Sequence, residues 1–375
     1  MKHLDNFCHH PWEGLDINAQ GEFRPCCKYT TPIATNLDNY LNSTELHELR
    51  EQFLRGERPT KCERCWKDED AGIASKRQLD SNYIFKGHSQ PLTQTSYLSA
   101  TFGNSCNIAC RTCHSYSSSS WIRDERELSK DRKITIYPHN DFFKDEQYKQ
   151  DLYSVVATAT NIVISGGEPF LAGKREHIEF LDQIRTNSSD VSITYITNGT
   201  TRPADELWQK LKTFKQVEFH VSIDGTDRVF EYLRYPAKWN EVLENLEAYR
   251  KMAERLDNVT LSLGHTVSIM NVWYLPDFFI WCLKNKFPKP YIGMVTHPNH
   301  YNIQNLPRHA KEKLTDRLDR HNLNEITSFM MGERESDEEF DKFRELTARL
   351  DDLRNQHISE SLPELVDLIG DPIVK

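Results

Sequence analysis

Eight of the nine cysteines lie in the first third of the 375-residue chain. Three of them form a CxxxCxxC array, Cys106-Asn-Ile-Ala-Cys110-Arg-Thr-Cys113, directly after a predicted strand. Thiolates this close together on one loop can bind three corners of a cubane iron–sulfur cluster and leave the fourth iron without a protein ligand. The same thiolates with His114 could instead bind a tetrahedral zinc ion, so the spacing alone leaves both sites open. The ninth cysteine, Cys282, lies in an apolar stretch and is expected in the core.

Small polar motifs follow the next three predicted strands. They are SGGEP at residues 165–169, TNG at 197–199 and SIDG at 222–225. The carboxyl ends of parallel strands meet on one rim, where barrel enzymes place their sites. Paired glycines let the backbone approach a ligand closely. Any one such motif is usually a turn, but the cysteine loop and these three motifs, in order along the chain, together indicate a ligand site.

The remaining cysteines cluster near the start of the chain, at Cys8, Cys26, Cys27, Cys62 and Cys65. In a reducing compartment such clustering indicates metal ligation more than disulfide bonds. Four thiolates saturate a [4Fe-4S] cluster, which leaves one cysteine over. A structural zinc ribbon is the alternative, because CxxC pairs are common zinc ligands.

The elements that must position these residues alternate between short β-rich runs and amphipathic helical runs from residue 96 onward. The predicted strands are residues 97–102, 161–165, 192–197, 217–223, 259–267 and 291–295. The predicted helices are residues 118–128, 144–156, 174–186, 204–214, 239–256 and 275–285. Six β-α units do not close an eight-stranded barrel, so we expect an α/β fold with a partial, open (β/α)6 barrel.

Three domains are expected along the chain. Residues 1–92 contain a predicted hairpin (15–18 and 22–24) and a helix at about 43–55 with Asn42 as its cap, and they would form a small cysteine-rich domain. Residues 93–298 would form the barrel. Residues 299–375 would form a helical extension, with helices near 310–320 and 337–356 and no chemical motif.

The composition narrows the class of protein. Hydrophobic residues make up 38% of the chain and charged residues 27%, which is typical of a globular protein. No apolar run approaches the roughly eighteen residues of a membrane span, and the first residues do not resemble a signal peptide, so we expect a cytoplasmic protein with no membrane partner. The net charge of −9 disfavours nucleic acid as a partner.

Residues 97–295 resemble the radical S-adenosylmethionine (SAM) superfamily. This resemblance implies that Cys106, Cys110 and Cys113 bind a catalytic [4Fe-4S] cluster whose open iron chelates the amino and carboxylate groups of SAM. The implied cofactor-binding residues are Gly166, Gly167, Glu168 and Pro169 for the methionine amino group, Asn198 of the TNG motif, Ser222 and Asp224 for the ribose or methionine, Arg234 for the carboxylate, and Asn271. Many members have an aromatic residue where this chain has Thr112, which puts the packing of the adenine in doubt.

The N-terminal cysteines, with their flanking sequence, resemble the SPASM/twitch domains of radical SAM enzymes. Those domains usually follow the barrel, whereas this segment precedes it, so the resemblance implies a permuted order. It also implies an auxiliary cluster, expected to be [4Fe-4S], on Cys8, Cys26, Cys62 and Cys65, with Cys27 as the alternate ligand.

The implied activity is that of an oxidoreductase or transferase. Reductive cleavage of SAM would give a 5′-deoxyadenosyl radical that abstracts hydrogen from a substrate. Resemblance to SPASM/twitch enzymes suggests a peptide or protein side chain as substrate, with flavodoxin or ferredoxin as electron donor. The alternatives are a small substrate such as a sugar or aminocyclitol, or a non-catalytic metal-binding scaffold. Tyr195, His220, His265 and Tyr291 lie on strands and could face the barrel interior, although core packing is the default for each.

Overall fold

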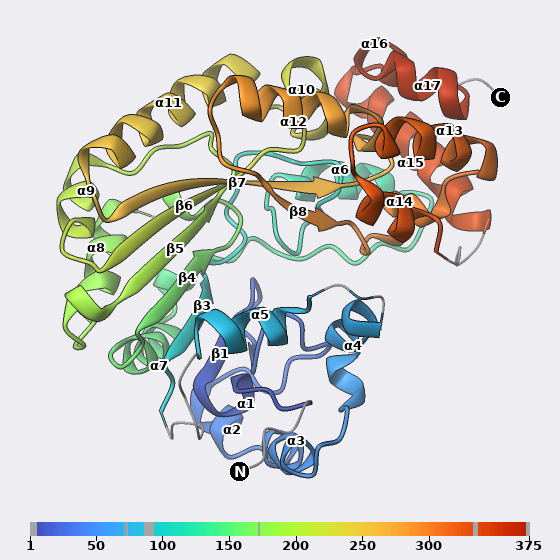
Figure 1. The fold of residues 1–375 in the computed structure, drawn as a ribbon. Helices are drawn as coiled ribbons and strands as arrows, with labels where there is room; N and C mark the ends of the chain where they lie inside the picture. Colours follow the sequence, from blue (N-terminus) through green and yellow to red (C-terminus); the bar gives the residue numbers. More distant parts are fainter. Residues whose placement is uncertain are drawn as a thin grey trace.

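The structure is a computed structural model that describes residues 6–70, 72, 74–85, 94–171, 173–332 and 337–372. An eight-stranded sheet runs through the molecule in the order β2-β1-β3-β4-β5-β6-β7-β8 (Figure 1). Its strands are β1 (Gly14–Ile17), β2 (Phe23–Arg24), β3 (Tyr97–Thr101), β4 (Asn161–Ser165), β5 (Ser192–Thr197), β6 (Gln216–Ser222), β7 (Val259–Val267) and β8 (Tyr291–Met294). All neighbours are parallel except β1 and β2, which are antiparallel. The predicted α/β fold with a mostly parallel sheet is confirmed.

The two faces of the sheet differ in burial, as β6 illustrates. Val217, Phe219 and Val221 are fully buried, whereas the alternate residues Glu218 and His220 are partly exposed. Phe219 packs against Trp208 and Tyr249 of the covering helices, with ring centroids 4.8 and 5.0 Å away. Because successive strand residues point to opposite faces, the strands have an outer face covered by helices and a more polar inner face.

The helices of the barrel follow the strands in turn. They are α6 (Trp121–Leu128), α7 (Glu146–Val156), α8 (Lys174–Asp182), α9 (Asp205–Leu211), α10 (Asp227–Leu233), α11 (Trp239–Arg255) and α12 (Leu275–Lys284). Figure 1 shows α8, α9, α11 and α12 along the outer face. Helix α10 was not predicted, because its seven residues lie within a loop-like stretch that the sequence does not separate from the SIDG turn.

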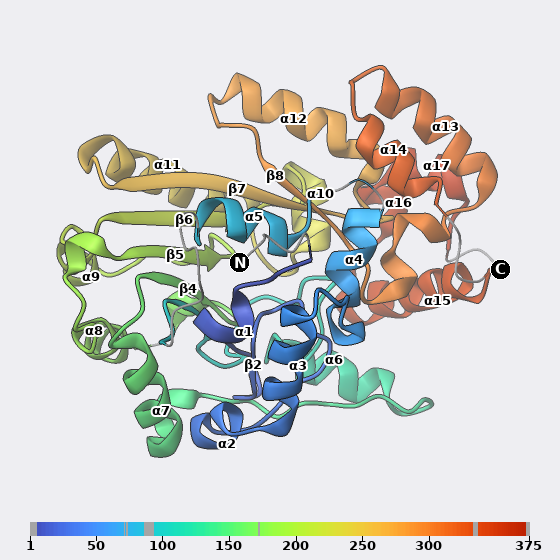
Figure 2. The same cartoon turned by 60° about the horizontal axis from the view of Figure 1, so that its bottom comes forward.

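The N-terminal segment contributes a hairpin and five short helices. The helices are α1 (His10–Glu13), α2 (Leu37–Leu41), α3 (Thr44–Leu54), α4 (Glu63–Asp70) and α5 (Lys76–Tyr83). Figure 1 and Figure 2 show them gathered on the side of the sheet opposite the barrel helices. The predicted hairpin is present, but β1 also pairs in parallel with β3, with Leu15 opposite Leu98. The sheet therefore has two more strands than the six that were predicted for the barrel.

The start of helix α3 differs from the prediction by one residue. Asn42 was expected as its N-cap, but Asn42 instead ends the preceding helix α2. The side chain of Ser43 caps α3 and accepts a hydrogen bond from the backbone N–H of Leu46 at 3.2 Å. Asn42 is the C-cap of α2, a short helix that was not predicted from the sequence.

Five helices follow the barrel: α13 (Arg308–Asp319), α14 (Asn324–Met330), α15 (Asp337–Arg354), α16 (Ile358–Ser361) and α17 (Pro363–Ile369). Helix α15 contacts α6, and α16 contacts α10, so this segment packs on the helices next to the cysteine loop. No helix in the described ranges has the length and apolar character needed to cross a membrane.

Candidate active site

The three cysteines of the CxxxCxxC loop meet at one cavity of about 310 Å³. The loop begins just after β3, so the cysteines lie at the carboxyl end of the strand, as predicted. Five of the nine residues predicted to bind the cofactor line the same cavity: Gly166, Gly167, Asn198, Ser222 and Arg234. The structure therefore brings together residues from the ends of β3, β4, β5 and β6 and from the end of α10.

The glycine pair packs directly on the segment that leads into Cys106. Gly166 has a φ of +112°, and a Cβ there would lie 2.8 Å from the carbonyl oxygen of Gly103. A Cβ at Gly167 would overlap the carbonyl oxygen of Ser105. The backbone N–H of Glu168 donates to that same oxygen at 2.8 Å. Larger residues at either glycine would push the SGGEP turn away from the cysteine loop.

Glu168 and Pro169, also predicted to bind the cofactor, are buried and lie behind the lining of this cavity. The Glu168 carboxylate accepts hydrogen bonds from the Thr197 hydroxyl at 2.9 Å and from the Asn198 backbone N–H at 2.7 Å. Burial raises the pKa of Glu168 to about 7, although these hydrogen bonds oppose the shift. Glu168 thus ties the SGGEP turn to the TNG turn.

Asp224 binds the guanidinium of Arg234, and Asn271 binds the backbone of Asp224. Nε and Nη2 of Arg234 donate to Oδ2 of Asp224 at 2.9 and 2.7 Å, and the side chain of Asn271 donates to the backbone oxygen of Asp224 at 3.1 Å. Burial acts to lower the pKa of Arg234, but Asp224 more than offsets this and raises it. Asp224 and Asn271 were predicted to contact SAM; they do not line the cavity, and they orient the arginine that does.

Burial raises the pKa of all three loop thiols, and that of Cys110 to about 12, with the positive charge of Arg234 opposing the rise. Metal binding would therefore release protons from this loop. The side-chain amide of Asn198 lies 3.8 Å from Sγ of Cys106 and donates toward it. Across the described ranges, no three His, Cys, Asp or Glu residues are arranged to hold a single metal ion.

The sequence did not reveal that the N-terminal hairpin reaches this cavity. Asn18, Ala19 and Arg24 line it together with Tyr116. Arg24 forms an ion pair with Asp16 of β1 at 2.6 Å. The predicted turn at residues 19–21 was a signal for these residues, but only the unpredicted pairing of β1 with β3 brings them to the cysteine loop.

Two of the four strand residues noted above face the inner side of the sheet. The Ser262 hydroxyl donates to Glu218 at 2.5 Å, so Nδ1–H of His220 donates to Ser262 at 2.8 Å and Nε2 remains an acceptor. Burial lowers the pKa of His220, which keeps this form dominant at neutral pH. The ring of Tyr291 lies edge-on to His220 at 6.1 Å.

The other two strand residues belong to the core behind the sheet. Tyr195 stacks on Phe219 at 5.6 Å, and His265 packs against Phe278 of α12 at 4.5 Å. Both are essentially inaccessible to solvent. Tyr195 and His265 therefore pack in the core, which was the default expectation for both.

Four of the five N-terminal cysteines line a second cavity: Cys8, Cys26, Cys62 and Cys65. They come from the start of the chain, the end of β2, and the start of α4. The enclosed space is small, about 20 Å³, and positively charged side chains of Lys28, Lys76 and Arg77 contribute to its wall. Burial raises the pKa of all four thiols.

Cys27, the alternate ligand, does not line this second cavity. Cys27 is partly buried, and this burial raises the pKa of its thiol, while the positive charges of Lys76, Lys28 and Arg24 oppose the shift. The placement favours Cys26 as the ligand.

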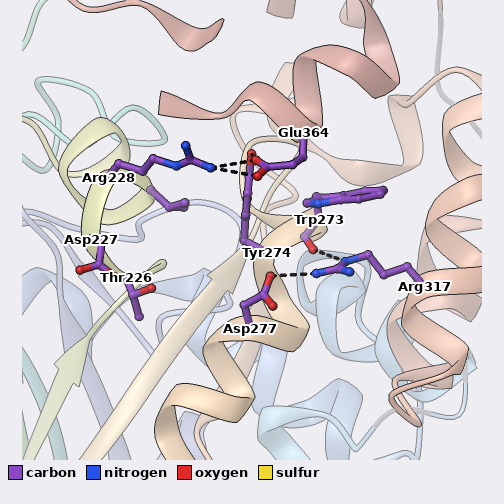
Figure 3. Close-up of a pocket in the computed structure, with 9 residues that line it drawn as sticks. Thr226, Asp227, Arg228, Trp273, Tyr274, Asp277, Arg317 and Glu364 are labelled. Carbon is purple, nitrogen blue, oxygen red and sulfur yellow. Dashed lines mark hydrogen bonds and ion pairs between the residues drawn. The ribbon is translucent and has the colours of Figure 1, made fainter. Parts of the chain in front are cut away.

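A third cavity, of about 420 Å³, lies away from the cysteines, between α10, α12, α13 and α17 (Figure 3). Four of its charged groups form two pairs: both oxygens of Glu364 accept from Arg228 at 3.0 Å, and Arg317 pairs with Asp277 at 2.8 Å. The Tyr274 hydroxyl also donates to Glu364, at 2.7 Å. These contacts attach the C-terminal helices to the barrel.

Comparison with known proteins shows what the barrel is similar to. Residues 101–271 match the family model of the Radical SAM superfamily. A comparison with curated proteins gave no match. The solved structures of similar fold include native anSMEcpe with bound AdoMet, at 18% identity and a TM-score of 0.42, covering 61% of this chain and 62% of that one.

They also include Streptococcus suis SuiB bound to the precursor peptide SuiA, at 14% identity and a TM-score of 0.36, covering 88% of this chain and 63% of that one. The chain thus spans less than two thirds of the length of these two structures. The segment that matches the family model holds the CxxxCxxC loop, the glycine pair and Arg234. Residues 101–271 are therefore similar to the Radical SAM superfamily.

Proposed function

We propose that the chain binds a [4Fe-4S] cluster through Cys106, Cys110 and Cys113, and binds SAM beside it in the 310 Å³ cavity. When bound, these two groups supply the chemistry, in which one-electron reduction cleaves SAM and the resulting 5′-deoxyadenosyl radical takes a hydrogen atom from the substrate. The observation that carries the proposal is the meeting of three thiols with Gly166, Gly167 and an arginine at one cavity.

The side chains around the cavity suit the two charged ends of an amino acid. Arg234 stays protonated and offers a planar guanidinium, a geometry that suits a carboxylate. Asp224 holds that guanidinium in place from behind. The SGGEP turn contributes backbone carbonyl groups, which accept hydrogen bonds from an ammonium group. Three protein thiolates leave one corner of a cubane open for such a ligand.

The second cavity supports an auxiliary [4Fe-4S] cluster on Cys8, Cys26, Cys62 and Cys65, as in a twitch or SPASM domain. Four thiols fill the ligand set of such a cluster, so its irons would all be bound to protein and its role would be electron transfer. Positive side chains in the wall offset the negative charge that four thiolates bring. A structural zinc ion on the same thiols is the alternative, and metal analysis separates the two.

The inner face of the sheet supports a peptide or protein side chain as substrate. It continues from Ser222, at the SAM cavity, along β6 to His220 and Glu218, and across to Tyr291 at the edge strand β8. His220 presents an acceptor nitrogen, and Tyr291 is 62% exposed. A surface of this extent, with polar groups already oriented, suits a substrate larger than a metabolite. A flavodoxin or ferredoxin would supply the electron.

Anaerobic reconstitution with iron and sulfide tests this function. We expect about eight irons per chain and formation of 5′-deoxyadenosine after addition of SAM and dithionite. About four irons with one zinc would assign zinc to the second cavity and keep the catalytic site. Zinc in the CxxxCxxC loop, with no charge-transfer absorption and no affinity for SAM, would overturn the proposal.

A further inference from the structure

Arg111, one of the two residues between Cys110 and Cys113 of the catalytic loop, does not line the cavity. Arg111 is 1% exposed, and its Nη2 forms an ion pair with Asp351 of helix α15 and a hydrogen bond of 3.0 Å with Gln356. Its Nε donates to the backbone oxygen of Tyr232 at 3.1 Å, and its guanidinium lies 3.6 Å from the centre of the Tyr232 ring. The loop is therefore fastened to the C-terminal helices, about 240 residues away in sequence.

Asp351 joins three parts of the molecule at this point. Besides Arg111, it accepts hydrogen bonds from the Tyr232 hydroxyl at 2.9 Å and from the backbone N–H of Ile358 at 2.7 Å. It is 2% exposed. Its carboxylate is thus fully engaged in holding the cysteine loop, the end of α10 and the start of α16 together.

The same contact region holds the segment that carries Arg234. The backbone N–H groups of Ala109 and Arg111 donate to the backbone oxygens of Tyr235 and Leu233, at 2.6 and 2.8 Å. Arg234 lies between those two acceptors in sequence. A shift of the cysteine loop would therefore move the arginine that faces the cavity as well.

Arg354, at the end of helix α15, is a second buried arginine next to the cysteine loop. The guanidinium of Arg354 is 4.7 Å from the Trp121 ring and 5.0 Å from the Tyr235 ring, and its Nε donates to Asp124 at 2.9 Å. Nη1 and Nη2 of Arg354 are buried and have no hydrogen-bond partner among the residues that the structure describes. Trp121 in turn donates from Nε1 to the backbone oxygen of Cys110 at 2.8 Å. A partly compensated positive charge thus lies one side chain away from a predicted cluster ligand.

We propose that helix α15 positions the catalytic cysteine loop: Asp351 holds the loop in its ligating shape through Arg111, and Arg354 places a buried positive charge beside it. This inference rests on the function proposed above. Three thiols must keep a fixed spacing to bind a cubane, and a loop held in that shape before binding avoids the entropy cost of ordering. Removing one partner of a buried charge pair is destabilising, because the other charge is left buried without compensation. Asp351 and Arg354 are positioning residues, since neither lines the cavity.

The charge of Arg354 has a separate expected effect. Reduction adds a negative charge to the cluster, and a nearby buried cation stabilises the more negative state. We expect Arg354→Met to shift the midpoint potential of the catalytic cluster to more negative values. Loss of packing alone would not move the potential in a defined direction.

Hydrogen exchange in the full-length chain tests the positioning role. We expect Asp351→Asn to speed exchange in a peptide covering residues 104–120 by about tenfold, in the cluster-free chain, and to leave a peptide from α11 unchanged. Gln356→Ala removes one acceptor of Arg111 from a half-exposed position and should give a smaller increase in the same peptide. Gln356→Ala replaces Asp351→Asn in this test if the Asp351→Asn chain does not fold.

The matched control is Glu364→Gln, which breaks the other attachment of the C-terminal helices, at the exposed cavity of Figure 3. It should leave loop exchange, iron content and potential unchanged. The inference is wrong if Asp351→Asn and Gln356→Ala leave the loop peptide unchanged, if Glu364→Gln accelerates it equally, or if Arg354→Met leaves the potential where it was. Failure of the wild-type chain to cleave SAM would instead refute the proposed function, because the exchange experiment needs no cofactor.

Discussion

The two cysteine cavities differ in the number of their thiols and in what surrounds them. The N-terminal cavity has four thiols and a wall that includes Lys28, Lys76 and Arg77. The catalytic cavity has three thiols and opens toward glycines, Asn198 and Ser222. A full ligand set in a closed space suits structure or electron transfer, whereas an incomplete set beside hydrogen-bonding groups suits a ligand that completes it. The comparison assigns different roles to cysteines that look alike in the sequence.

The largest expected difference between the cavities concerns Cys110. Cys110→Ala removes one of only three ligands, so we expect SAM cleavage to fall by about a thousandfold or more and iron to fall from about eight to about four per chain. The measurements are 5′-deoxyadenosine by chromatography and iron by colorimetry. Cys282→Ala, which changes a buried cysteine outside both cavities, is the control. If Cys110→Ala cleaved SAM at the wild-type rate, the three-thiol cavity would not be the site of SAM cleavage.

A smaller but still large effect is expected at Gly167. Its Cβ would overlap Ser105, so Gly167→Ala should displace the SGGEP turn and weaken SAM binding by about a hundredfold. The N-terminal cavity should keep its metal, which iron analysis would show as at least four irons per chain. Gly293→Ala is a control for glycine replacement itself, because the nearest atom would lie 3.8 Å from the new Cβ and the backbone there has no positive φ. Equal SAM affinity in Gly167→Ala and the wild-type chain would show that the turn does not hold SAM.

The buried carboxyl behind the catalytic cavity predicts a pH effect. The pKa of Glu168 is raised from 4.5 to about 7, so its contribution to folding is most favourable below about 4.5 and is lost as the pH rises to about 7. The shift corresponds to about 3 kcal/mol. Glu168→Gln should remove this part of the pH dependence, as measured by urea unfolding of the cluster-free chain at pH 5 and pH 8. If the free energy of unfolding changed by the same amount between pH 5 and pH 8 in both proteins, the raised pKa would not be assigned to Glu168.

The smallest effects on SAM cleavage are expected in the N-terminal cavity. Cys62→Ala should lose about four irons but keep SAM cleavage within a fewfold of the wild-type rate, while turnover of the substrate is lost. Cys27→Ala should keep all the iron, because Cys27 does not line the cavity. Loss of iron in Cys27→Ala and not in a Cys26→Ala variant would reverse the choice of ligand.

Local patterns in the sequence predicted most of the barrel. The strands at 161–165, 192–197 and 259–267 have the predicted bounds, because β-rich runs between polar turns are a local signal. The loop cysteines and the glycine pair were found for the same reason. Each motif lies within a few residues of its strand.

Long-range contacts explain what the sequence did not predict. The register of β1 on β3 depends on pairing across more than eighty residues, and no turn fixes it. The hydrogen bonds of Glu168 to Asn198 and of Asp224 to Arg234 were not predicted, because a motif does not show which way its side chain turns. The partner of Arg111 lies in the C-terminal segment, where a single aspartate in a charged helix gives no sign of its role.

The backbone ladder between β1 and β3 has a mechanical consequence. The hairpin that follows β1 leads into Cys26, and β3 leads into the loop of Cys106, so the two cysteine sites are mounted on adjacent strands of one sheet. Hinge motion between them would require breaking this ladder. If both sites hold clusters, as proposed, electrons that pass between them would cross a distance that does not change when substrate binds.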